Sequence, residues 1–579
     1  MLAPTLAHTP QSGDGAEIVT AALRGGVLHP TGFPLQAWLD RALAQMPDLP
    51  VALAISALGL VAHAAAAGLV AETLRTIGVG PAGRLWGAAA FALLPSLWAV
   101  AVVPEVFSLA HLLLATLLFV AVRWSLTPPA PSARLAAGLG ALGAAAAAQH
   151  PIALAGVPAL LIAAARVCGS SAGRVWRGAL AIAVLAAGVA AAYASLPLLR
   201  TSSPWPDWGH LRSAGDVARH ALRLDYGAFS LAAAREEATR SALVLWVREL
   251  ATWWNVALAL ALAGLVTLGR RRELRPALWP IAGTLLGGIA ILWRGRLPAQ
   301  SYSDAYLEKL QGPATLGCAL LLGIGAQWLR DRLGHRGRPG FDVALGIFVL
   351  AWLGLEWPRA DASADRTLDL YARGIALELP RDAVYVTEGE VEAFLGAPVP
   401  RGPRFPVSQP LASLPWYARE VAPRLEPRVL GGDATVTVED WDGFMAACFD
   451  RRLAVASTSR AMVATPFGAP ELRGLLYVAR PGAVEELTTE TIAAAAALAP
   501  LTEQLPTLGG EGHEFSRFYV RRFARAYAGA AEALRRRGRG TLAATAESVA
   551  VVLESGGDLA TRSRLLRALV AGSRTPAAP

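Results

Sequence analysis

The class of this protein is decided by residues 51–74, VALAISALGLVAHAAAAGLVAETL, an uninterrupted apolar stretch with one acid near its end. A helix needs about 20 apolar residues to cross the hydrocarbon of a bilayer. Of the 579 residues, 54% are hydrophobic and 17% are charged, whereas an ordinary soluble domain has about 45–50% and about 25%. Because the apolar surplus lies before residue 358, we predict a polytopic membrane half followed by a soluble half.

Nine further apolar runs follow the same pattern, which predicts a mainly α-helical membrane domain of about ten spans over residues 1–357. The fourth and fifth runs are short and meet at the helix-breaking His150-Pro151, so they form either two spans or a re-entrant pair. The predicted spans are 51–74, 84–103, 106–123, 134–149, 151–165, 177–199, 242–268, 276–293, 312–329 and 341–357.

The net charge of +9 comes almost entirely from arginine, much of it in short loops between apolar runs. Charge in such loops sets membrane topology, with the basic loops on the cytoplasmic side. This rule places residues 1–50, Glu105, His150, and the loops 200–241 and 294–311 on the outward face, together with the C-terminal half. We therefore expect a multi-pass protein of a bacterial inner membrane and no nucleic-acid partner. The three cysteines lie far apart, which excludes a disulfide framework.

The C-terminal half divides into two predicted parts. Residues 358–480 begin with a helical pattern that leads into a β-rich AVYVT at 383–387 and a polar turn, which predicts a small extracytoplasmic α/β domain. Residues 481–579 have apolar residues at helical spacing in three stretches. These stretches predict one or two helix-hairpin, TPR-like repeats, or a simple helical cap on the domain.

Two carboxylates near the chain start are the first candidates for chemistry. Asp14 and Glu17 are three residues apart, so a helix that starts near Gly15 places both at its N-terminal turn, where backbone N–H groups favour negative charge. Such a group can act as a general base toward a hydroxyl or help hold a divalent ion. The alternative is a capping box. The following HPTGFP, with His29, forms a rigid turn that a mere connector does not require.

Further candidates lie at the predicted outward ends of spans. Glu105 follows Pro104 in a tight turn, where it is either functional or an acid solvated at the interface. His150 follows a run of alanines and is either functional or a satisfied core histidine. Arg200 is followed by Trp208, a combination that suits a lipid phosphate but also suits simple interfacial anchoring. Arg294 invites the same interpretation. The chain has no P-loop and no HExxH, so nothing supports nucleotide hydrolysis or zinc proteolysis.

Five motifs follow one another along the chain: GDGAE (13–17), GGVLHPTGFPL (25–35), LLPSLWAVAVVPEVFSLAHLLL (93–114), AAAQHPIALAGVPALL (146–161), and LPLLR with PWPDWG (196–209). In this order they resemble a bacterial multispanning family related to protein O-mannosyltransferases, within the GT-C glycosyltransferase superfamily. The resemblance covers residues 1–240 and, more loosely, 241–400.

The resemblance implies an inverting enzyme that transfers a mannose-like sugar from a polyprenyl-phosphate donor to an extracytoplasmic acceptor, either protein Ser/Thr or a glycan. It assigns catalysis to Asp14 with Glu17. It assigns donor binding to His29, Glu105, His150, Arg200 and Trp208. Arg294 joins these donor-binding candidates on its position alone. The resemblance implies no certain cofactor beyond the lipid-linked sugar donor. It leaves open whether a divalent cation is required.

Two departures from the family pattern bear on activity. Gly15 follows the acid where the family has a small polar residue, and Gln149-His150-Pro151 replaces an Asn-His-Leu-like string. The family also has a span before its acidic loop, so we expect that the true start lies upstream of Met1. The alternatives from other classes are a transporter or flippase of lipid-linked or anionic solutes, and a non-catalytic envelope scaffold.

Overall fold

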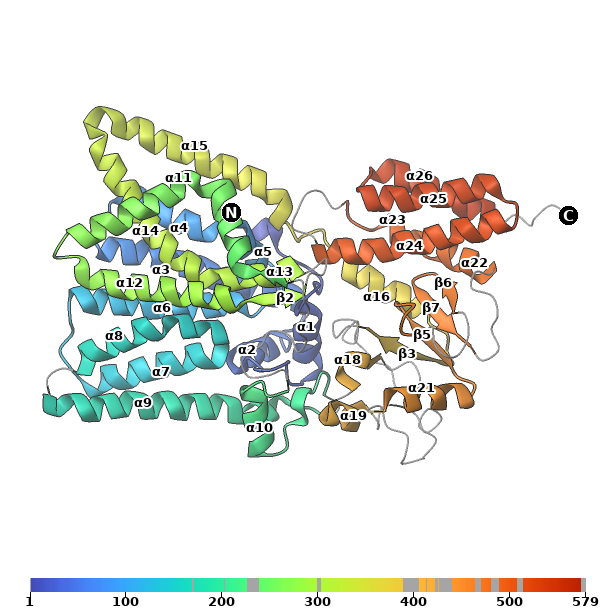
Figure 1. Ribbon diagram of the computed structural model, residues 1–579, viewed down its shortest axis with the longest axis horizontal. Helices are drawn as coiled ribbons and strands as arrows, with labels where there is room; N and C mark the ends of the chain where they lie inside the picture. Colours follow the sequence, from blue (N-terminus) through green and yellow to red (C-terminus); the bar gives the residue numbers. More distant parts are fainter. Residues whose placement is uncertain are drawn as a thin grey trace. The chain divides into compact units, whose positions relative to one another are not determined.

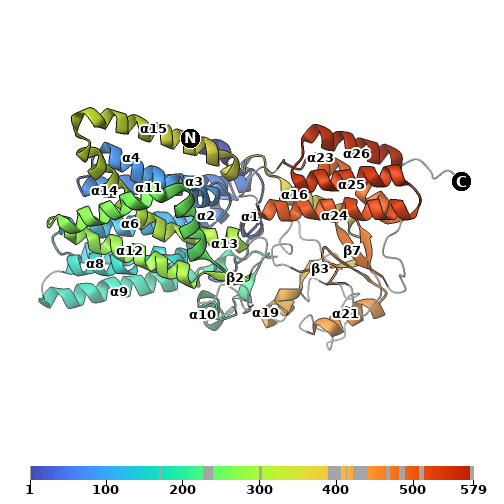
Figure 2. The same ribbon diagram turned by 45° about the horizontal axis from the view of Figure 1, so that its top comes forward.

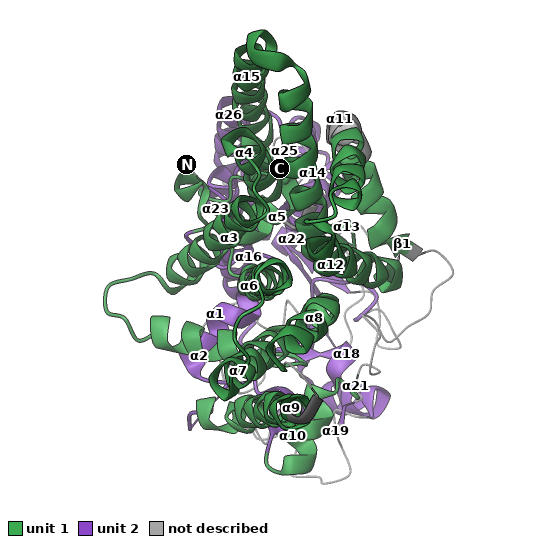
Figure 3. Cartoon of the chain, turned by 90° about the vertical axis from the view of Figure 1, so that its left-hand side faces the viewer, with its two compact units in different colours: residues 1–7, 28–200, 212–363 green, residues 8–27, 201–211, 364–579 purple. Residues whose placement is uncertain are grey.

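The computed structural model is mainly helical and forms two compact units (Figure 3). The first unit contains residues 1–7, 28–200 and 212–363, and the second contains 8–27, 201–211 and 364–579. The structure describes residues 2–168, 171–202, 204–225, 239–298, 303–388, 406–412, 414–421, 425, 440–463, 470–480, 489–507 and 514–573.

Long helices lie side by side in the first unit (Figures 1 and 2). They follow the predicted apolar runs closely, because a run of this composition satisfies its backbone polar groups only as a helix when lipid surrounds it. These helices are α3 (Val51–Thr76), α4 (Pro81–Ala92), α5 (Pro95–Ala101), α6 (Phe107–Leu126), α7 (Ala133–Gln149), α8 (Val157–Cys168), α9 (Ser171–Ala194), α11 (Ala242–Arg270), α12 (Arg275–Arg294), α14 (Gly312–Arg332) and α15 (Gly334–Ala360).

Seven helices among the described residues are long and apolar enough to span a membrane, or eight if α4 and α5 count as one bent span. They identify a multi-pass membrane protein but do not confirm the expected ten spans. At the span predicted over 84–103, the chain bends by 65° where Pro95 starts a new helix, so this segment is either a broken span or a re-entrant loop. Helix α7 has only 17 residues, and among the described residues of α11 the stretch Leu258–Arg270 forms a shorter apolar helix.

Helix α14 is the centre of the first unit, since every residue from Gly312 to Ala326 is buried. Its glycines allow neighbouring backbones to approach closely. A Cβ on Gly325 would lie 1.8 Å from the Leu260 carbonyl oxygen of α11, and one on Gly323 would lie 2.6 Å from the Gly83 oxygen of α4. Small residues at helix contacts are typical of membrane bundles, in which helices associate by close packing.

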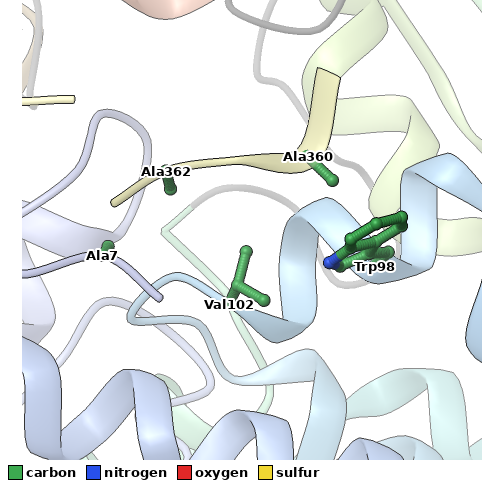
Figure 4. Close-up of a cluster of buried hydrophobic side chains, with 5 residues drawn as sticks. All are labelled: Ala7, Trp98, Val102, Ala360 and Ala362. Atoms are coloured by element: carbon green, nitrogen blue, oxygen red, sulfur yellow. The ribbon is translucent and has the colours of Figure 1, made fainter. Parts of the chain in front are cut away.

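The chain start is held against the last long helix of the first unit. Ala7, Trp98, Val102, Ala360 and Ala362 form one buried apolar cluster (Figure 4). Backbone hydrogen bonds run from Ala7 N to Val102 O at 2.9 Å and from Ala362 N to the Thr5 oxygen at 3.1 Å. The end of α15 and the start of the chain are therefore fixed at one end of this unit.

A five-stranded mixed sheet forms the centre of the second unit, in the order β4-β3-β5-β7-β6. Strands β4, β3 and β5 are parallel, and β7 and β6 continue the sheet antiparallel. The strand predicted at AVYVT is present as β3. The strands are β3 (Ala383–Thr387), β4 (Val407–Ser408), β5 (Ala454–Ser457), β6 (Glu471–Arg473) and β7 (Leu476–Ala479).

Short helices accompany this sheet, and three longer helices end the chain. The three predicted tail helices are present with their bounds shifted by at most two residues: α24 (Glu514–Arg536), α25 (Gly540–Ser555) and α26 (Leu559–Ser573). The preceding helices are α16 (Thr367–Glu378), α18 (Gln409–Ala412), α19 (Pro415–Val421), α21 (Trp441–Asp450), α22 (Thr489–Ala497) and α23 (Ala499–Glu503). The domain boundaries at 357/358 and 480/481 and the solubility of this half stay predictions.

Candidate functional site

The two catalytic candidates lie at the start of a short helix in the second unit. Helix α1 (Gly15–Arg24) begins where the sequence predicts, with Asp14 at its N-cap and Glu17 in its first turn. The Asp14 side chain makes no helix-capping hydrogen bond, so the capping-box alternative is wrong. The Glu17 side chain is buried. Both carboxylates therefore lie where the helix dipole stabilises negative charge.

The end of α1 is joined to the PWPDWG segment, almost 180 residues later in the chain. Val27 N donates to Pro206 O at 2.9 Å, and Trp208 N donates to Val27 O at 3.3 Å. A Cβ on Gly26 would lie 1.8 Å from the Pro206 oxygen, so only glycine fits at this contact. These bonds place Asp14, Glu17 and Trp208 in one unit, an association that spacing along the sequence does not reveal.

Trp208 is buried, with an indole ring centroid 5.3 Å from that of Trp416 in α19. Trp416 belongs to the C-terminal half, and nothing in its sequence context predicts this partner. The Trp208 ring is therefore covered by protein and not simply exposed as an interfacial anchor. Its assignment to donor binding stays a prediction.

Two of the donor-binding candidates in the first unit share one aromatic neighbour. The Phe33 ring lies 5.1 Å from that of His29 and stacks 5.3 Å from that of His150. His150 ends α7, and its Nδ1 accepts a hydrogen bond from Ile152 N at 3.1 Å, the first bond of the 3-10 helix η2 (Pro151–Gly156). In the neutral ring, this bond leaves the proton on Nε2.

The HPTGFP turn has an unusual backbone conformation. Gly32 and Phe33 both adopt positive φ, at 84° and 43°. A Cβ on Gly32 would lie 2.7 Å from Nε2 of His220, which comes from α10 (Ala214–Ala221). Burial lowers the pKa of His220 to about 3, so this ring is neutral at physiological pH. A close neutral neighbour therefore fixes the turn that carries His29.

Buried amides that sequence reasoning missed connect this turn to two other elements. Gln149 accepts from Gln36 N at 3.1 Å and donates to the Val106 carbonyl at 2.9 Å. Gln36 in turn donates to Asp40 at 2.7 Å, within α2 (Pro34–Leu43). Burial raises the pKa of the Asp40 carboxyl to about 8. The available signal was that two polar residues, Gln36 and Asp40, lie four apart on one face of α2.

Glu105 has a partner that the sequence analysis did not assign. The Lys309 ammonium lies 2.5 Å from Glu105 Oε1, and both side chains are almost fully buried. Lys309 opens the 3-10 turn η5 (Lys309–Gln311), which follows α13 (Ser303–Glu308). The expected alternative of a solvated interfacial acid is therefore wrong. The signal was that Lys309 is the only lysine in the chain.

The remaining cations lie in the same unit but in different settings. Arg200 follows the 3-10 turn η3 (Leu196–Leu199) and is half-buried, whereas Arg294 is exposed at the end of α12. Strands β1 (Thr239–Ser241) and β2 (Arg296–Pro298) pair antiparallel. This pairing joins the loops 200–241 and 294–311.

The Glu105–Lys309 pair adds the turn at Glu105 to the same group of segments. The segments of this unit that are predicted to face outward therefore share one end. The side of the membrane that this end faces stays a prediction. Among the described residues, no group of three or more His, Cys, Asp or Glu is placed to hold a metal ion.

Comparison with known proteins supports the resemblance. Residues 14–167 match the family model of the Protein O-mannosyl-transferase TMEM260 N-terminal domain. The chain is 25% identical over 465 residues to the mouse (Mus musculus) Protein O-mannosyl-transferase TMEM260. This match covers 75% of the chain and 64% of the mouse protein, less than two thirds of that relative's length. The chain is therefore related to the protein O-mannosyltransferases.

Proposed function

We propose that this relative of protein O-mannosyltransferases is a membrane glycosyltransferase that takes a mannose-like sugar from a polyprenyl-phosphate donor. The acceptor is an extracytoplasmic hydroxyl, most simply that of a protein Ser or Thr. One observation carries the proposal. The match to a protein O-mannosyl-transferase domain starts at Asp14 and includes His29, Glu105 and His150. We place the chain in a bacterial plasma membrane with its C-terminal half outside.

The proposed reaction is a single displacement with inversion at the anomeric carbon. Asp14 accepts the proton of the acceptor hydroxyl while the oxygen forms its bond to that carbon. The bond between the carbon and the phosphate oxygen breaks, and the phosphate leaves with the electron pair. Arg200, with help from Arg294, stabilises the growing charge on the phosphate. The family resemblance is what joins Asp14 to Arg200 in one reaction.

Local geometry agrees with these roles. Asp14 and the buried Glu17 occupy the first turn of α1, which stabilises a carboxylate and keeps Asp14 ready to accept a proton. His29 and His150 flank Phe33, so imidazole N–H groups from two segments come together at one aromatic ring. A sugar has hydroxyl groups and apolar C–H faces, and a group of imidazole and aromatic side chains can bind both. The C-terminal half is left to bind the acceptor.

The test is transfer of labelled mannose by the purified full chain in lipid nanodiscs, from polyprenyl-phosphate-mannose to a Ser/Thr-containing peptide. We expect Asp14→Asn to lower transfer by about 10²–10⁴-fold, the usual contribution of a general base. Asp48→Asn is the matched control, because Asp48 is an exposed acid in the same N-terminal segment. Asparagine tolerates its positive φ of 61°.

Two results would count against the proposal. Wild-type transfer by Asp14→Asn would remove Asp14 from the role of base. A wild-type chain that moves the lipid donor between leaflets but transfers no sugar would favour the flippase alternative.

A further inference from the structure

The Glu105–Lys309 ion pair joins two segments of the first unit that are 204 residues apart in the chain. Glu105 lies in the turn between α5 and α6, and Lys309 lies between α13 and α14. The distance from Nζ to Oε1 is 2.5 Å, and the two side chains are 6% and 2% exposed. Both charges are therefore removed from water.

A buried ion pair of this kind adds little net stability to a fold. Removing two charges from water costs about as much as their attraction returns, so apolar residues of similar size hold a fold as well or better. The need for a charge at this position thus points to something other than folding. A carboxylate that must stay ionised in a dry site requires a fixed cation beside it.

The identity of the cation supports this interpretation. The chain has 53 lysines and arginines, and Lys309 is its only lysine. An ammonium is compact, whereas a guanidinium is planar and larger. The Lys309 ammonium also lies 4.8 Å from the ring centroid of Tyr306 and 5.9 Å from that of Phe107. These two rings restrict the space around the ammonium and add cation–π attraction.

One of these rings also touches a predicted donor-binding residue. The Phe107 ring centroid lies 4.5 Å from that of His150, which itself stacks on Phe33 beside His29. Lys309 and Glu105 are thus connected through Phe107 to the His29–His150 pair. The ion pair belongs to the same end of the first unit as the proposed donor site.

We propose that Lys309 is a positioning residue that holds Glu105 ionised and oriented, so that this carboxylate accepts a hydrogen bond from a hydroxyl of the donor sugar. The inference rests on the proposed function. An ionised carboxylate is an acceptor only, so it attracts hydroxyl groups and repels a phosphate. Glu105 therefore recognises the sugar of the donor and not its phosphate, and Lys309 acts on the reaction only through Glu105.

The experiment separates this role from simple packing by a double-mutant cycle. The full chain in detergent is prepared as wild type, Lys309→Met, Glu105→Gln and the double variant. Thermal stability is measured together with kcat and KM for polyprenyl-phosphate-mannose and for a panel of monodeoxy donors. Glu72→Gln is the control, because Glu72 pairs with Arg75 at the same 2.5 Å but on an exposed helix surface.

We expect Lys309→Met and Glu105→Gln to lower the melting temperature by several degrees, because each removes one partner of a buried ion pair. The double variant should regain the wild-type melting temperature. Its KM for the donor should stay raised about tenfold, because the loss of one hydrogen bond of about 1.4 kcal/mol weakens binding by that factor. Wild type should discriminate against one monodeoxy donor, and the double variant should not. Lys309→Arg should keep the stability and raise KM, because the larger cation displaces Glu105. Glu72→Gln should behave like wild type.

Two results would overturn the inference. If the double variant regains both the melting temperature and the donor KM, the pair is only structural. If Lys309→Met keeps the wild-type KM and donor discrimination, Glu105 does not depend on Lys309. A failure of the proposed function looks different, because wild type itself would then transfer no sugar, and the inference would fall with it.

Discussion

The two compact units hold their helices together in opposite ways. In the first unit, α14 meets its neighbours through glycines, and a Cβ on Gly264 or Gly325 would lie 1.9 Å or 1.8 Å from a facing carbonyl oxygen. In the second unit, α24 packs through large buried side chains such as Phe523 and Tyr527, whose partners Tyr371 and Thr502 lie in α16 and α23. Lipid tails are as apolar as leucine, so close packing decides which helices associate within a membrane. In the water that the sequence predicts around the second unit, burial of large apolar side chains stabilises the packing.

One ion pair from each unit shows a second difference, which is how deeply the charges are buried. Glu105–Lys309 in the first unit and Arg535–Glu547 in the second both have a nitrogen-to-oxygen distance of 2.5 Å. The first pair is buried, whereas the second has side chains that are 46% and 57% exposed. Loss of one partner should cost about 3–5 kcal/mol in a buried pair and about 0–1 kcal/mol in an exposed one. Distance alone therefore says little about what a pair contributes.

The largest effect is expected from a substitution that breaks the glycine contact between α14 and α11 in the first unit. Gly325→Leu should abolish the monodisperse folded protein, because the new side chain collides with the α11 backbone at Leu260, which cannot yield as a flexible side chain can. Gly346→Leu is the control in α15, since nothing lies within 4 Å of its Cβ position. Size-exclusion chromatography of detergent extracts measures both. Equal recovery of the two variants would show that close approach does not hold α11 on α14.

The next effect tests the core of the second unit. Phe523→Ala should cost about 3–5 kcal/mol, because a fully buried aromatic side chain leaves a cavity. Val551→Ala, on the exposed side of α25, should change stability by less than about 0.5 kcal/mol. Hydrogen-exchange protection of α24 and α25 in the full chain reports the difference. Unchanged protection in Phe523→Ala would contradict the large-side-chain account of this unit.

A smaller effect concerns the buried acid of α2. Burial raises the pKa of Asp40 from 3.8 to about 8, so the folded chain keeps a proton that the unfolded chain loses above pH 4. Stability should therefore fall as the pH rises from 5 to 8, by at most about 4 kcal/mol at about 1.4 kcal/mol per pH unit.

Asp40→Asn should flatten this pH dependence, since asparagine keeps the oxygen that accepts from Gln36. Melting temperatures of the two proteins between pH 5 and 8 measure the difference. Identical pH profiles would show that Asp40 is ionised in the folded state.

The smallest effect is expected at the exposed ion pair. Arg535→Ala should lower the stability of the second unit by less than about 1 kcal/mol, and 1 M salt should remove most of that difference, because solvent screens exposed charges. Denaturation at low and high salt measures it. A loss as large as that of Lys309→Met would mean that exposure does not decide the strength of these pairs.

The sequence predicted the features that depend on local patterns. The helix start at Gly15, the strand at 383–387 and the tail helices follow from apolar spacing and terminal residues within a few positions. The bend before Pro95 was missed, and the count of ten spans stays a prediction. A proline within an apolar run leaves hydropathy high while the helix direction changes, as it does between α4 and α5.

The candidate site was only partly accessible to the same reasoning. His29, Glu105 and His150 came from motifs, but no motif marks the contacts of the two histidines with Phe33 or of Glu105 with Lys309. The Trp208–Trp416 contact joins residues more than 200 positions apart. Such pairings depend on how elements pack, which composition and periodicity do not encode.

The most direct test of the central claim is donor choice by the wild-type chain. Purified protein in nanodiscs is given labelled mannose either on polyprenyl phosphate or on a nucleoside diphosphate, with a Ser/Thr peptide as acceptor. The account predicts that mannose passes to the peptide from the lipid donor, with inverted anomeric configuration, and not from the nucleotide. Transfer from the nucleotide donor, or no transfer from the lipid donor, would contradict it.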